Sequence, residues 1–599
     1  MFFTKFDSMT TEDVNAKVLA SPRAEFYGVP CKCLAGRELK LRLAGEFAPK
    51  QLDYSFTDEA MLNFTENGVS YDAPYTADCI GSVVLFTHLV PETTRGWHIV
   101  YDMDTELVTA FETWFGITVP VGMDLMGTRE PTHTRDIPRE VQRHYHFGYN
   151  DAGQKAPEKL HTTTNRLEGR GMHWLFDGGD EILTYFPSVV CSTTVDLNPP
   201  EDTLTVTYPS DYIRINDEMF IFARWGVEFG GEMWLDVLDM FDMDAVGFRF
   251  GFDADDEFIY CFHDAALTVT GDAAHLETIT LNGDKSPPMA TLSGKGARYA
   301  YRPKDMDIPM TKAEAHEAAK TQQIFDFSGP NIMASGNTLE FKYDLVGRKF
   351  SLTYDQVRTP YAWSAKNIPD RLIQAYEYDF TTKEALRWRE PGGTWHEEKY
   401  VCFEPARDIY FFSHMLTGDP DFASVTHAVD LSNGLTTCVY ARVGSWTSEW
   451  EIGATVLFGV ASGEGIAPAP FSKRHDFTTD LVGKSYAWAY SDSMSSIHVY
   501  SSPHSYSWTI FQSDNSGGAT WSSPCFYIKL RDDAYLFQWV EENCNGSQGL
   551  VCFNPQIMHD GGFFFGCGHT GLRLNVTGAY ARDLGTFNIM PYFDNIANI

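Results

Sequence analysis

Short stretches in which apolar and polar residues alternate dominate the chain. They are rich in β-branched and aromatic residues and are separated by Asp, Asn, Gly and Pro, a pattern typical of β-strands. Clear examples lie at 349–354, 410–415, 435–441, 486–490, 526–530 and 535–539. Helical patterning is confined to the N-terminus and to an alanine-rich run in which Thr311 and Glu314 have the spacing of a capping box. The pattern therefore predicts an all-β protein.

The sequence also repeats itself. The motif LAGR at 34–37 recurs as LVGR at 345–348, and LEGR at 167–170 recurs as LVGK at 481–484. Because all four share an L-x-G-R/K opening, we interpret the chain as four related units in the order A-B-A′-B′. About eight to nine short strands per unit would suit a small antiparallel barrel, which leaves no exposed sheet edge and encloses room for one ligand.

The spacing of tryptophans supports the correspondence of B with B′. Trp225 follows Trp174 by 51 residues, and Trp539 follows Trp488 by the same interval. A carboxylate follows the later tryptophan in both units. We expect the following organisation along the chain: an N-terminal segment at 1–30, barrel A at 31–140, barrel B at 141–272, a linker with one helix at 273–340, barrel A′ at 341–470 and barrel B′ at 471–599.

Charge and composition exclude several function classes. The 599 residues carry a formal net charge of −35, which repels nucleic acids and anionic membranes. The longest apolar runs fall short of the roughly 20 residues of a membrane span. The first residues lack the pattern of a secretory signal, and the 11 cysteines are too scattered for a disulfide framework. We expect a cytoplasmic protein, and the sequence leaves open whether it forms a homo-oligomer.

The four-unit pattern, including LVGRKFSLTYD at 345–355, resembles the molybdenum cofactor biosynthesis protein F (MoaF-like) family. Members of that family pair an N-terminal and a C-terminal lipocalin-like barrel. The resemblance covers about 30–270 and 340–590 and implies a tandem duplication. The implied fold class is all-β, with four lipocalin-like (calycin) antiparallel β-barrels and a short helical linker. It implies no role in making the molybdenum cofactor.

Unit B′ has a more distant resemblance to the phenolic acid decarboxylases, cofactor-independent lipocalin-like lyases. The G-K-x-F-x-Y-x-Y opening of that family corresponds to GKSYAWAY at 483–490, in which Trp488 replaces one tyrosine. Its W-x-E segment corresponds to Trp539-Val540-Glu541. The carboxylate-binding arginine of that family has no counterpart in the intervening stretch 506–511.

The candidate catalytic residues of B′ follow from this resemblance and from alternation. Glu541 shares a strand face with Trp539, and desolvation among aromatic residues would raise its pKa toward neutrality, as suits proton transfer. Tyr490 would orient a substrate oxygen, while Tyr486, Trp488 and Trp539 would contact the substrate. The alternative is that the strand ends at Trp539 and Glu541 is a solvated rim residue.

The other units offer weaker candidates. In B, Trp174 and Glu228 correspond to the tryptophan and glutamate of B′. In the A units, His88 and His414 each follow Thr or Ser on a strand, where a neutral imidazole could act as a base or bind a ligand. A satisfied core histidine is the alternative. Arg389 could bind a substrate carboxylate, although a solvated outer face fits its alternation as well.

Metal and nucleotide sites are not indicated. His144 and His146 share a strand face, but the sequence identifies no third ligand. The acidic stretch 236–244 lacks the order of a calcium loop, and we interpret it as acidic surface. The chain has no P-loop and no dinucleotide fingerprint. We therefore expect no cofactor and no metal.

These observations favour an enzyme: a cofactor-independent lyase (decarboxylase, dehydratase or hydratase) that acts on a small aromatic or phenolic acid-like metabolite inside a barrel by acid-base catalysis. The alternative is a non-catalytic binding or carrier protein for small apolar ligands. A third interpretation is that some barrels are scaffolds and only one unit of each pair keeps an open pocket.

Overall fold

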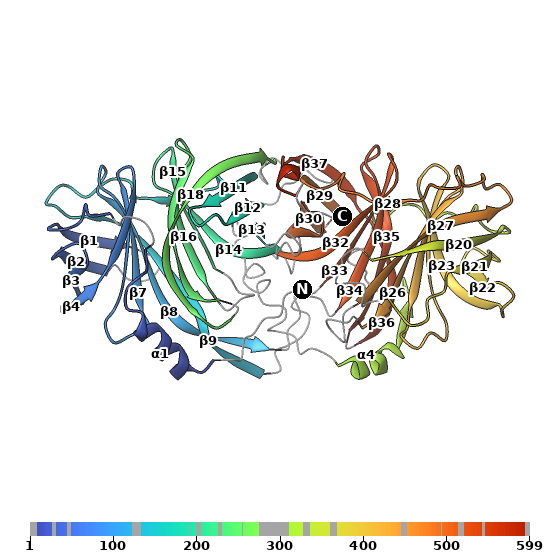
Figure 1. Ribbon diagram of the computed structural model, residues 1–599, viewed down its shortest axis with the longest axis horizontal. Coiled ribbons are helices and arrows are strands. Elements are labelled where there is room, and N and C mark those ends of the chain that lie inside the picture. The colour runs from blue at the N-terminus through green and yellow to red at the C-terminus, as the bar shows by residue number, and fades with distance from the viewer. Residues whose placement is uncertain are drawn as a thin grey trace.

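The computed structural model shows an all-β protein of four barrels (Figure 1). It describes residues 9–26, 31–44, 50–121, 133–189, 191–198, 205–225, 231–253, 255–274, 311–327, 336–359, 368–444, 452–492, 494–512, 520–541, 546–568 and 570–593.

Barrel A is a nine-stranded antiparallel sheet in the order β4-β3-β2-β1-β9-β8-β7-β6-β5. Its two edge strands are consecutive in the chain and are separated only by Tyr75. The strands are β1 (Glu38–Ala44), β2 (Lys50–Phe56), β3 (Met61–Glu66), β4 (Val69–Pro74), β5 (Thr76–Ile80), β6 (Val83–Leu89), β7 (Gly96–Asp102), β8 (Leu107–Val121) and β9 (His133–Asn150).

Barrel B follows with the strand order β10-β14-β13-β12-β11-β18-β17-β16-β15, and pairing of β14 with β15 closes it. Its strands are β10 (Thr162–Thr163), β11 (Arg170–Phe176), β12 (Glu181–Tyr185), β13 (Cys191–Asp196), β14 (Thr205–Arg214), β15 (Met219–Trp225), β16 (Met233–Asp239), β17 (Asp244–Phe252) and β18 (Phe258–Asp272).

Barrel A′ is a closed eight-stranded barrel with its strands in chain order. They are β20 (Lys349–Arg358), β21 (Ala375–Asp379), β22 (Ala385–Arg389), β23 (His396–Ala406), β24 (Ile409–Met415), β25 (Ser424–Asp430), β26 (Leu435–Val443) and β27 (Ile452–Gly463).

Barrel B′ has the order β19-β36-β35-β34-β33-β32-β31-β30-β29-β37, and β37 returns to β35. Its strands are β19 (Gln322–Ile324), β28 (Asp476–Phe477), β29 (Lys484–Ser491), β30 (Met494–Ser502), β31 (Ser505–Gln512), β32 (Thr520–Arg531), β33 (Ala534–Glu541), β34 (Ser547–Asn554), β35 (His559–Gly568), β36 (Gly571–Thr577) and β37 (Tyr580–Thr586), followed by the 3-10 turn η4 (Met590–Tyr592).

In space the barrels run A, B, B′, A′, so that the two B-type barrels meet at the centre (Figure 1). Hydroxyl groups bridge this central contact: Thr205 Oγ1 lies 2.5 Å from Ser505 Oγ, and Thr207 Oγ1 lies 2.5 Å from Ser522 Oγ. Each half of the chain therefore presents its B barrel to the other half, as two subunits of a dimer would.

Within each half, the A and B barrels share an apolar core. Leu85 and Phe111 of barrel A belong to the same buried cluster as Leu235 and Phe248 of barrel B. Period-two alternation explains this arrangement, because one strand face fills the barrel and the other packs against the neighbouring barrel.

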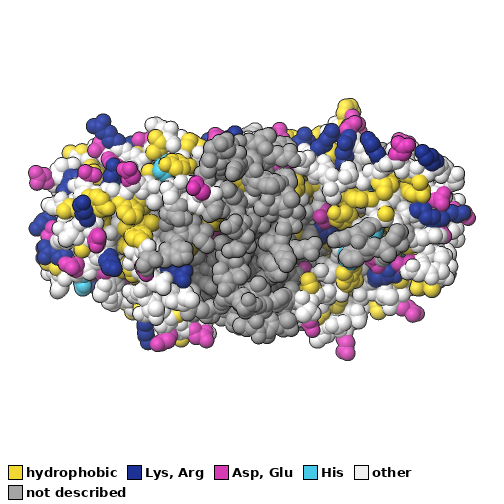
Figure 2. Space-filling view, turned by 180° about the vertical axis from the view of Figure 1, so that it is seen from behind, with side chains coloured by type: hydrophobic (Ala, Val, Ile, Leu, Met, Phe, Trp, Pro, Cys, Tyr) yellow, Lys and Arg dark blue, Asp and Glu magenta, His cyan; other side chains and the backbone are white. Residues whose placement is uncertain are grey.

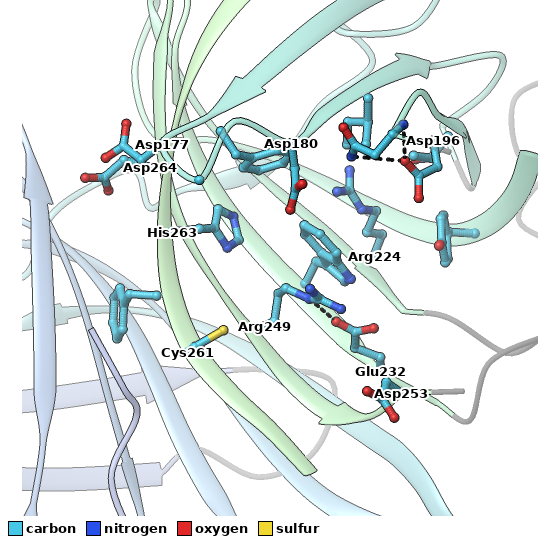
Figure 3. Close-up of a pocket in the computed structure, with 18 of the residues that line it drawn as sticks. Asp177, Asp180, Asp196, Arg224, Glu232, Arg249, Asp253, Cys261, His263 and Asp264 are labelled. Atoms are coloured by element: carbon cyan, nitrogen blue, oxygen red, sulfur yellow. Dashed lines mark hydrogen bonds and ion pairs between the residues drawn. The ribbon is translucent and has the colours of Figure 1, made fainter. Parts of the chain in front are cut away.

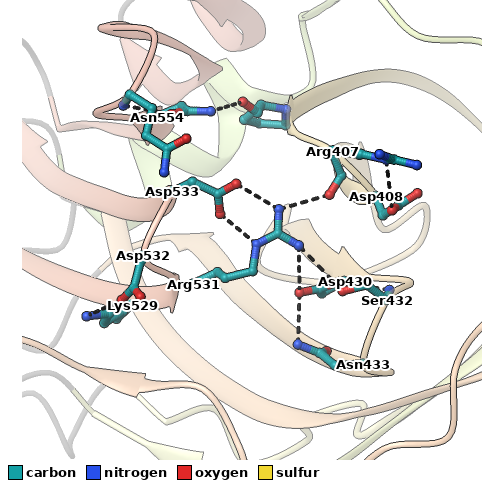
Figure 4. Close-up of polar contacts among 12 residues, drawn as sticks. Arg407, Asp408, Asp430, Ser432, Asn433, Lys529, Arg531, Asp532, Asp533 and Asn554 are labelled. Atoms are coloured by element: carbon teal, nitrogen blue, oxygen red, sulfur yellow. Dashed lines mark hydrogen bonds and ion pairs between the residues drawn. The ribbon is translucent and has the colours of Figure 1, made fainter.

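An arginine adds a polar link between A′ and B′ (Figure 4). The Arg531 guanidinium of B′ donates to the backbone oxygen of Arg407 at 2.9 Å and lies 3.4 Å from the carboxylate of Asp430, which is fully buried. Asp533 holds the other edge of the same guanidinium at 2.6 Å. A buried carboxylate of A′ thus has its counter-charge in B′.

The described residues contain two α-helices, α1 (Thr11–Ala20) and α4 (Lys312–Ala319). The capping box predicted at Thr311 and Glu314 is present, and Thr10 with Asp13 forms a second one at α1. Each helix packs two small apolar residues against the core shared by the barrels of its half, and Figure 1 shows the two at matching positions. The helix that we assigned to a linker is therefore the counterpart of α1 in the second half.

Basic and acidic side chains are interspersed over the coloured parts of the surface in Figure 2. Among the described residues, no helix has the length and apolar character required to cross a membrane.

Candidate functional site

Barrel B contains a cavity of about 810 Å³ that is open to the outside (Figure 3). Side chains from β11 through β18 line it, including Phe176, Arg224, Trp234, Arg249 and His263. A volume of this order accommodates a small organic ligand.

Arg224 is the central feature of this cavity. On β15 the side chains of Phe220, Phe222 and Arg224 face the barrel interior, whereas Ile221 and Ala223 pack against barrel A. Arg224 is 1% exposed, and its Nε and Nη1 have no hydrogen-bond partner. Burial lowers the pKa of the Arg224 guanidinium, yet arginine stays protonated in proteins. The cavity thus holds a buried cation whose hydrogen-bonding capacity is unfilled.

Arg224 begins a row of three side chains across neighbouring strands. Arg224 pairs with Trp234 in the β15–β16 register, and Trp234 pairs with Arg249 in the β16–β17 register. The guanidinium carbons of Arg224 and Arg249 lie 4.6 Å and 4.5 Å from the centroid of the Trp234 ring, within cation–π distance. Glu232 forms an ion pair with Arg249. Arg249 is therefore neutralised, while no ion pair joins Arg224 to a carboxylate in the described part of the chain.

A histidine–aspartate pair lies next to this row: Asp236 is two residues after Trp234 on β16, and His263 is on β18. His263 Nε2 is 2.7 Å from Asp236 Oδ1, and Asp236 is fully buried. Gly247 lies between the two in the strand register, and a Cβ there would clash with both side chains. The His263 Nδ1 and Asp236 Oδ2 atoms are buried without a partner. Such a pair can orient an imidazole for proton transfer.

The burial of Asp236 corrects one sequence interpretation. The composition of 236–244 indicates acidic surface, but Asp236 faces the interior of barrel B. Alternation explains the error, because Asp236 shares its strand face with Trp234 and Leu238 rather than with Asp239.

The residues predicted in B′ lie together in its interior, which is packed with aromatic side chains. Glu541 is the last residue of β33 and half-buried; its Oε1 accepts from Trp539 Nε1 at 2.8 Å and from the Tyr506 hydroxyl at 3.4 Å. The Tyr490 hydroxyl lies 3.3 Å from His498 Nε2. Burial raises the pKa of Tyr490. The structure thus joins Glu541 to Trp539 and Tyr506 by hydrogen bonds, and Tyr490 to His498.

The other two predicted aromatic residues of B′, Tyr486 and Trp488, are both buried and lie 5.9 Å apart between ring centroids, next to Phe553. Trp174 lies in the interior of barrel B, 5.6 Å from the Arg224 guanidinium carbon. Glu228 lies outside the described residues.

The tryptophan spacing predicts that Trp225 of barrel B corresponds to Trp539 of B′. The strand registers show that the residue equivalent to Trp539 is one position earlier in the chain, at Arg224. In B, Tyr212 pairs with Phe222; in B′, Tyr527 pairs with Phe537. Two residues further along β15 and β33, Arg224 therefore occupies the inward position that Trp539 occupies in B′. Barrel B′ therefore has no counterpart of the carboxylate-binding arginine of the decarboxylases. Barrel B does have an interior arginine, Arg224, but it lies on a different strand from the one that carries the arginine in that family.

His88 and His414 both lie fully buried in the A barrels, with both ring nitrogens engaged. His88 Nε2 is 3.1 Å from the Tyr54 hydroxyl and its Nδ1 is 3.2 Å from the backbone oxygen of Leu89. His414 has the equivalent contacts to Tyr378 at 2.8 Å and to Met415 at 2.7 Å. These contacts correspond to the alternative of satisfied core histidines.

In A′ the hydrogen-bond chain continues and fixes the tautomers. Because a carbonyl only accepts, His414 Nδ1 donates to Met415, so its Nε2 accepts the single hydroxyl proton of Tyr378. His427 Nε2, 2.7 Å from the same Tyr378 oxygen, must then donate to it, and His427 Nδ1 accepts from the Tyr354 hydroxyl at 2.6 Å. Burial lowers the pKa of both histidines, that of His414 to about 4.

Arg389 lies on the outer face of A′. Its neighbour Trp388 points inward, while the Arg389 Nε lies 2.5 Å from the Glu377 carboxylate and its guanidinium carbon lies 4.5 Å from the Trp395 ring centroid. It is not part of a barrel interior.

Sequence reasoning did not identify Arg224, Trp234, Arg249, Asp236 or His263. A signal was available: the inward positions of β15 read Phe220, Phe222, Arg224, so an apolar strand face ends in a cation. The motifs that resemble the lyase family lie in B′, whereas this cavity lies in B.

Comparison with known protein families identifies the last barrel. Residues 475–586, which span most of barrel B′, match the family model of the MoaF C-terminal domain. A search of curated proteins found no matching relative. Over its last barrel the chain is therefore similar to the MoaF C-terminal domain, and its four-barrel fold is consistent with a tandem of MoaF-like barrels.

Proposed function

We propose that the protein binds a small aromatic carboxylate inside barrel B. The observation that supports this most directly is Arg224, a fully buried guanidinium with unfilled donors beside a cavity of about 810 Å³. Leaving a buried charge unpaired is costly, and a ligand carboxylate would remove that cost.

The surroundings of Arg224 favour an aromatic ligand. Its guanidinium can bind a carboxylate in a bidentate manner, and Trp174, Trp234 and Phe176 provide ring surfaces within the same barrel. Aromatic walls contact a planar ligand by offset stacking or edge-to-face packing.

The test is isothermal titration calorimetry with 3-phenylpropionate, with 3-phenylpropan-1-ol as the neutral analogue. We expect the carboxylate to bind and the alcohol to bind at least about tenfold more weakly. Arg224→Gln should abolish the preference for the carboxylate. Glu541→Gln, which alters the interior of B′, should leave it unchanged. Equal binding of both compounds, or an unchanged preference in Arg224→Gln, would overturn the proposal.

The His263–Asp236 pair favours a second candidate function, cofactor-independent lyase chemistry on the bound acid. His263 would transfer a proton through Nδ1 while Asp236 holds its Nε2, so the acid-base role expected of Glu541 would belong to barrel B. A mass-spectrometric screen against hydroxycinnamic acids tests this, because loss of CO2 or gain or loss of water changes the mass. His263→Gln should stop such turnover and Glu541→Gln should not; a ligand returned unchanged would favour the carrier.

A further inference from the structure

Three cysteine side chains of barrel A lie together near its surface. The Sγ atoms of Cys31 and Cys33 are 2.9 Å apart, and the Cys31 thiol is also within hydrogen-bonding reach of the Cys79 thiol. The Cys31 amide donates to the backbone oxygen of Ala77 at 3.0 Å, which holds the segment before β1 against β5, the strand that carries Cys79. Cys31 is therefore the shared neighbour of two other thiols.

The cluster is accessible to solvent. Cys31 and Cys33 are partly exposed and Cys79 is exposed, whereas most of the other cysteines that the structure describes are buried. Buried structural thiols are generally inert, and reactive ones are at least partly exposed. Small molecules in solution can therefore reach these three thiols.

The equivalent place in barrel A′ is held by an ion pair. Counting from the L-x-G-R motifs, Lys342 corresponds to Cys31, and its amide likewise donates to the facing strand, to the backbone oxygen of Cys402 at 2.8 Å. Two residues further along that strand, at the position of Cys79, Glu404 forms an ion pair with Lys342 at 3.6 Å. The contact between segment and strand is thus made by opposite charges in A′ and by thiols in A.

The two thiols beside Cys31 keep their protons near neutral pH. Burial, followed by the interaction with Cys31, raises the pKa of both Cys33 and Cys79 to about 12. Both can therefore donate hydrogen bonds to the Cys31 sulfur. Hydrogen bonds to a sulfur atom favour its thiolate form, which is the nucleophile in thiol–disulfide exchange.

We propose that Cys31 and Cys33 form a reversible redox site whose oxidant is a small-molecule disulfide. The Cys31 thiolate attacks one sulfur of that disulfide, whose S–S bond breaks and releases one thiol. Cys31 then carries no charge, so Cys33 ionises more readily and attacks the Cys31 sulfur. The mixed disulfide breaks, the Cys31–Cys33 bond forms and the second thiol leaves. The two electrons and two protons that the cysteines lose are gained by the small molecule.

The reaction can run in both directions. Exposed disulfides are more readily reduced than buried structural ones, and the Cys31–Cys33 bond would lie where solvent thiols reach it. Excess small-molecule thiol should therefore restore the two cysteines.

Peptide mapping of the full chain after incubation with oxidised glutathione tests the inference, with free thiols blocked by N-ethylmaleimide before digestion. Trypsin cleaves after Lys32, so a Cys31–Cys33 disulfide joins two separate peptides, 24–32 and 33–37, whereas Cys79 lies in a third, 51–95. We expect the first two peptides to be linked in most of the protein and to separate after treatment with dithiothreitol. If Cys31 stays a free thiol, or is linked only to Cys79, the inference is wrong.

Two serine variants make the test sharper. In Cys33→Ser the glutathione adduct on Cys31 should accumulate at least about fivefold over the parent, because the thiol that displaces glutathione is missing. Cys79→Ser is the matched control: it removes the other neighbour of Cys31 and should leave both the adduct level and the linked peptides as in the parent. No accumulation in Cys33→Ser, or equal accumulation in both variants, would contradict the pairing of Cys31 with Cys33.

Discussion

Gly247 lies directly opposite His263 in the β17–β18 register, and a Cβ at residue 247 would lie 2.7 Å from His263 Nε2. The absence of a side chain at this position is what allows His263 to reach across the strand to Asp236. A glycine in a strand interior is otherwise unfavourable, so its place here has a specific structural reason.

We predict that Gly247→Ala separates His263 from Asp236 and destabilises the protein by about 2 kcal/mol, because it leaves a buried carboxylate without its partner. Thermal unfolding measures the loss, and the ¹⁵N chemical shifts of His263 report the tautomer. Gly178→Ala is the matched control, since a Cβ there meets no atom within 4 Å. If the Gly247→Ala variant keeps the stability and the His263 shifts of the parent, this account is contradicted.

Tyr378 and Tyr54 offer a matched comparison in the two A barrels. Tyr378 serves two buried histidines, whereas the Tyr54 hydroxyl lies 3.1 Å from His88 alone. Tyr378→Phe should therefore cost about 2–4 kcal/mol and Tyr54→Phe about half as much, since each change leaves imidazole nitrogens unsatisfied. Denaturant unfolding of both variants checks the order; an equal or reversed order would disprove the hydrogen-bond chain.

Buried neutral histidines should make the protein sensitive to acid. Burial lowers the pKa of His88, His161 and His414 to about 4, and of His475 and His498 to about 3. Because the folded pKa lies below the unfolded value of about 6.5, their stability contribution is complete above pH 6.5 and is lost as the pH falls toward 4. The melting temperature should drop over this interval, and a constant value would contradict the prediction.

Asp78 should act in the opposite direction. Its folded pKa of about 7 lies above the ordinary aspartate value of 3.8, so its ionisation destabilises the fold as the pH rises from about 4 to 7. Asp78→Asn should consequently stabilise the protein at pH 8, by about 1 kcal/mol, and have little effect near pH 4. Calorimetric scans at the two pH values measure the difference; equal effects at both would contradict the raised pKa of buried Asp78.

The architecture could be predicted because its signals are local and repeated. Alternation identified strands such as β33 and β24, and the L-x-G-R/K motifs separated the units. The capping box at Thr311 was also visible in sequence. Alternation does not reveal how the strands of one unit correspond to those of another. The chain between β11 and β15 of barrel B is one residue shorter than the corresponding part of B′, so Arg224, and not Trp225, occupies the position of Trp539.

The candidate site was predictable only in kind. A ligand-sized cavity in a barrel, with one unit of a pair open and the other packed, was among the sequence interpretations. The site in B could not be located from sequence, because Arg224, Asp236 and His263 come from three different strands and meet only in the folded barrel. A linear pattern does not record such a relationship between distant residues. Trp539, by contrast, lies in a short W-x-E segment that is visible in the linear sequence.

The most direct test of ligand binding in barrel B is a crystal structure of the protein with 3-(4-bromophenyl)propionate, in which anomalous scattering locates the bromine. We expect a bromine peak inside barrel B, with the carboxylate of the ligand within hydrogen-bond distance of Arg224. A peak inside B′ beside Glu541, with barrel B lacking ligand, would contradict it.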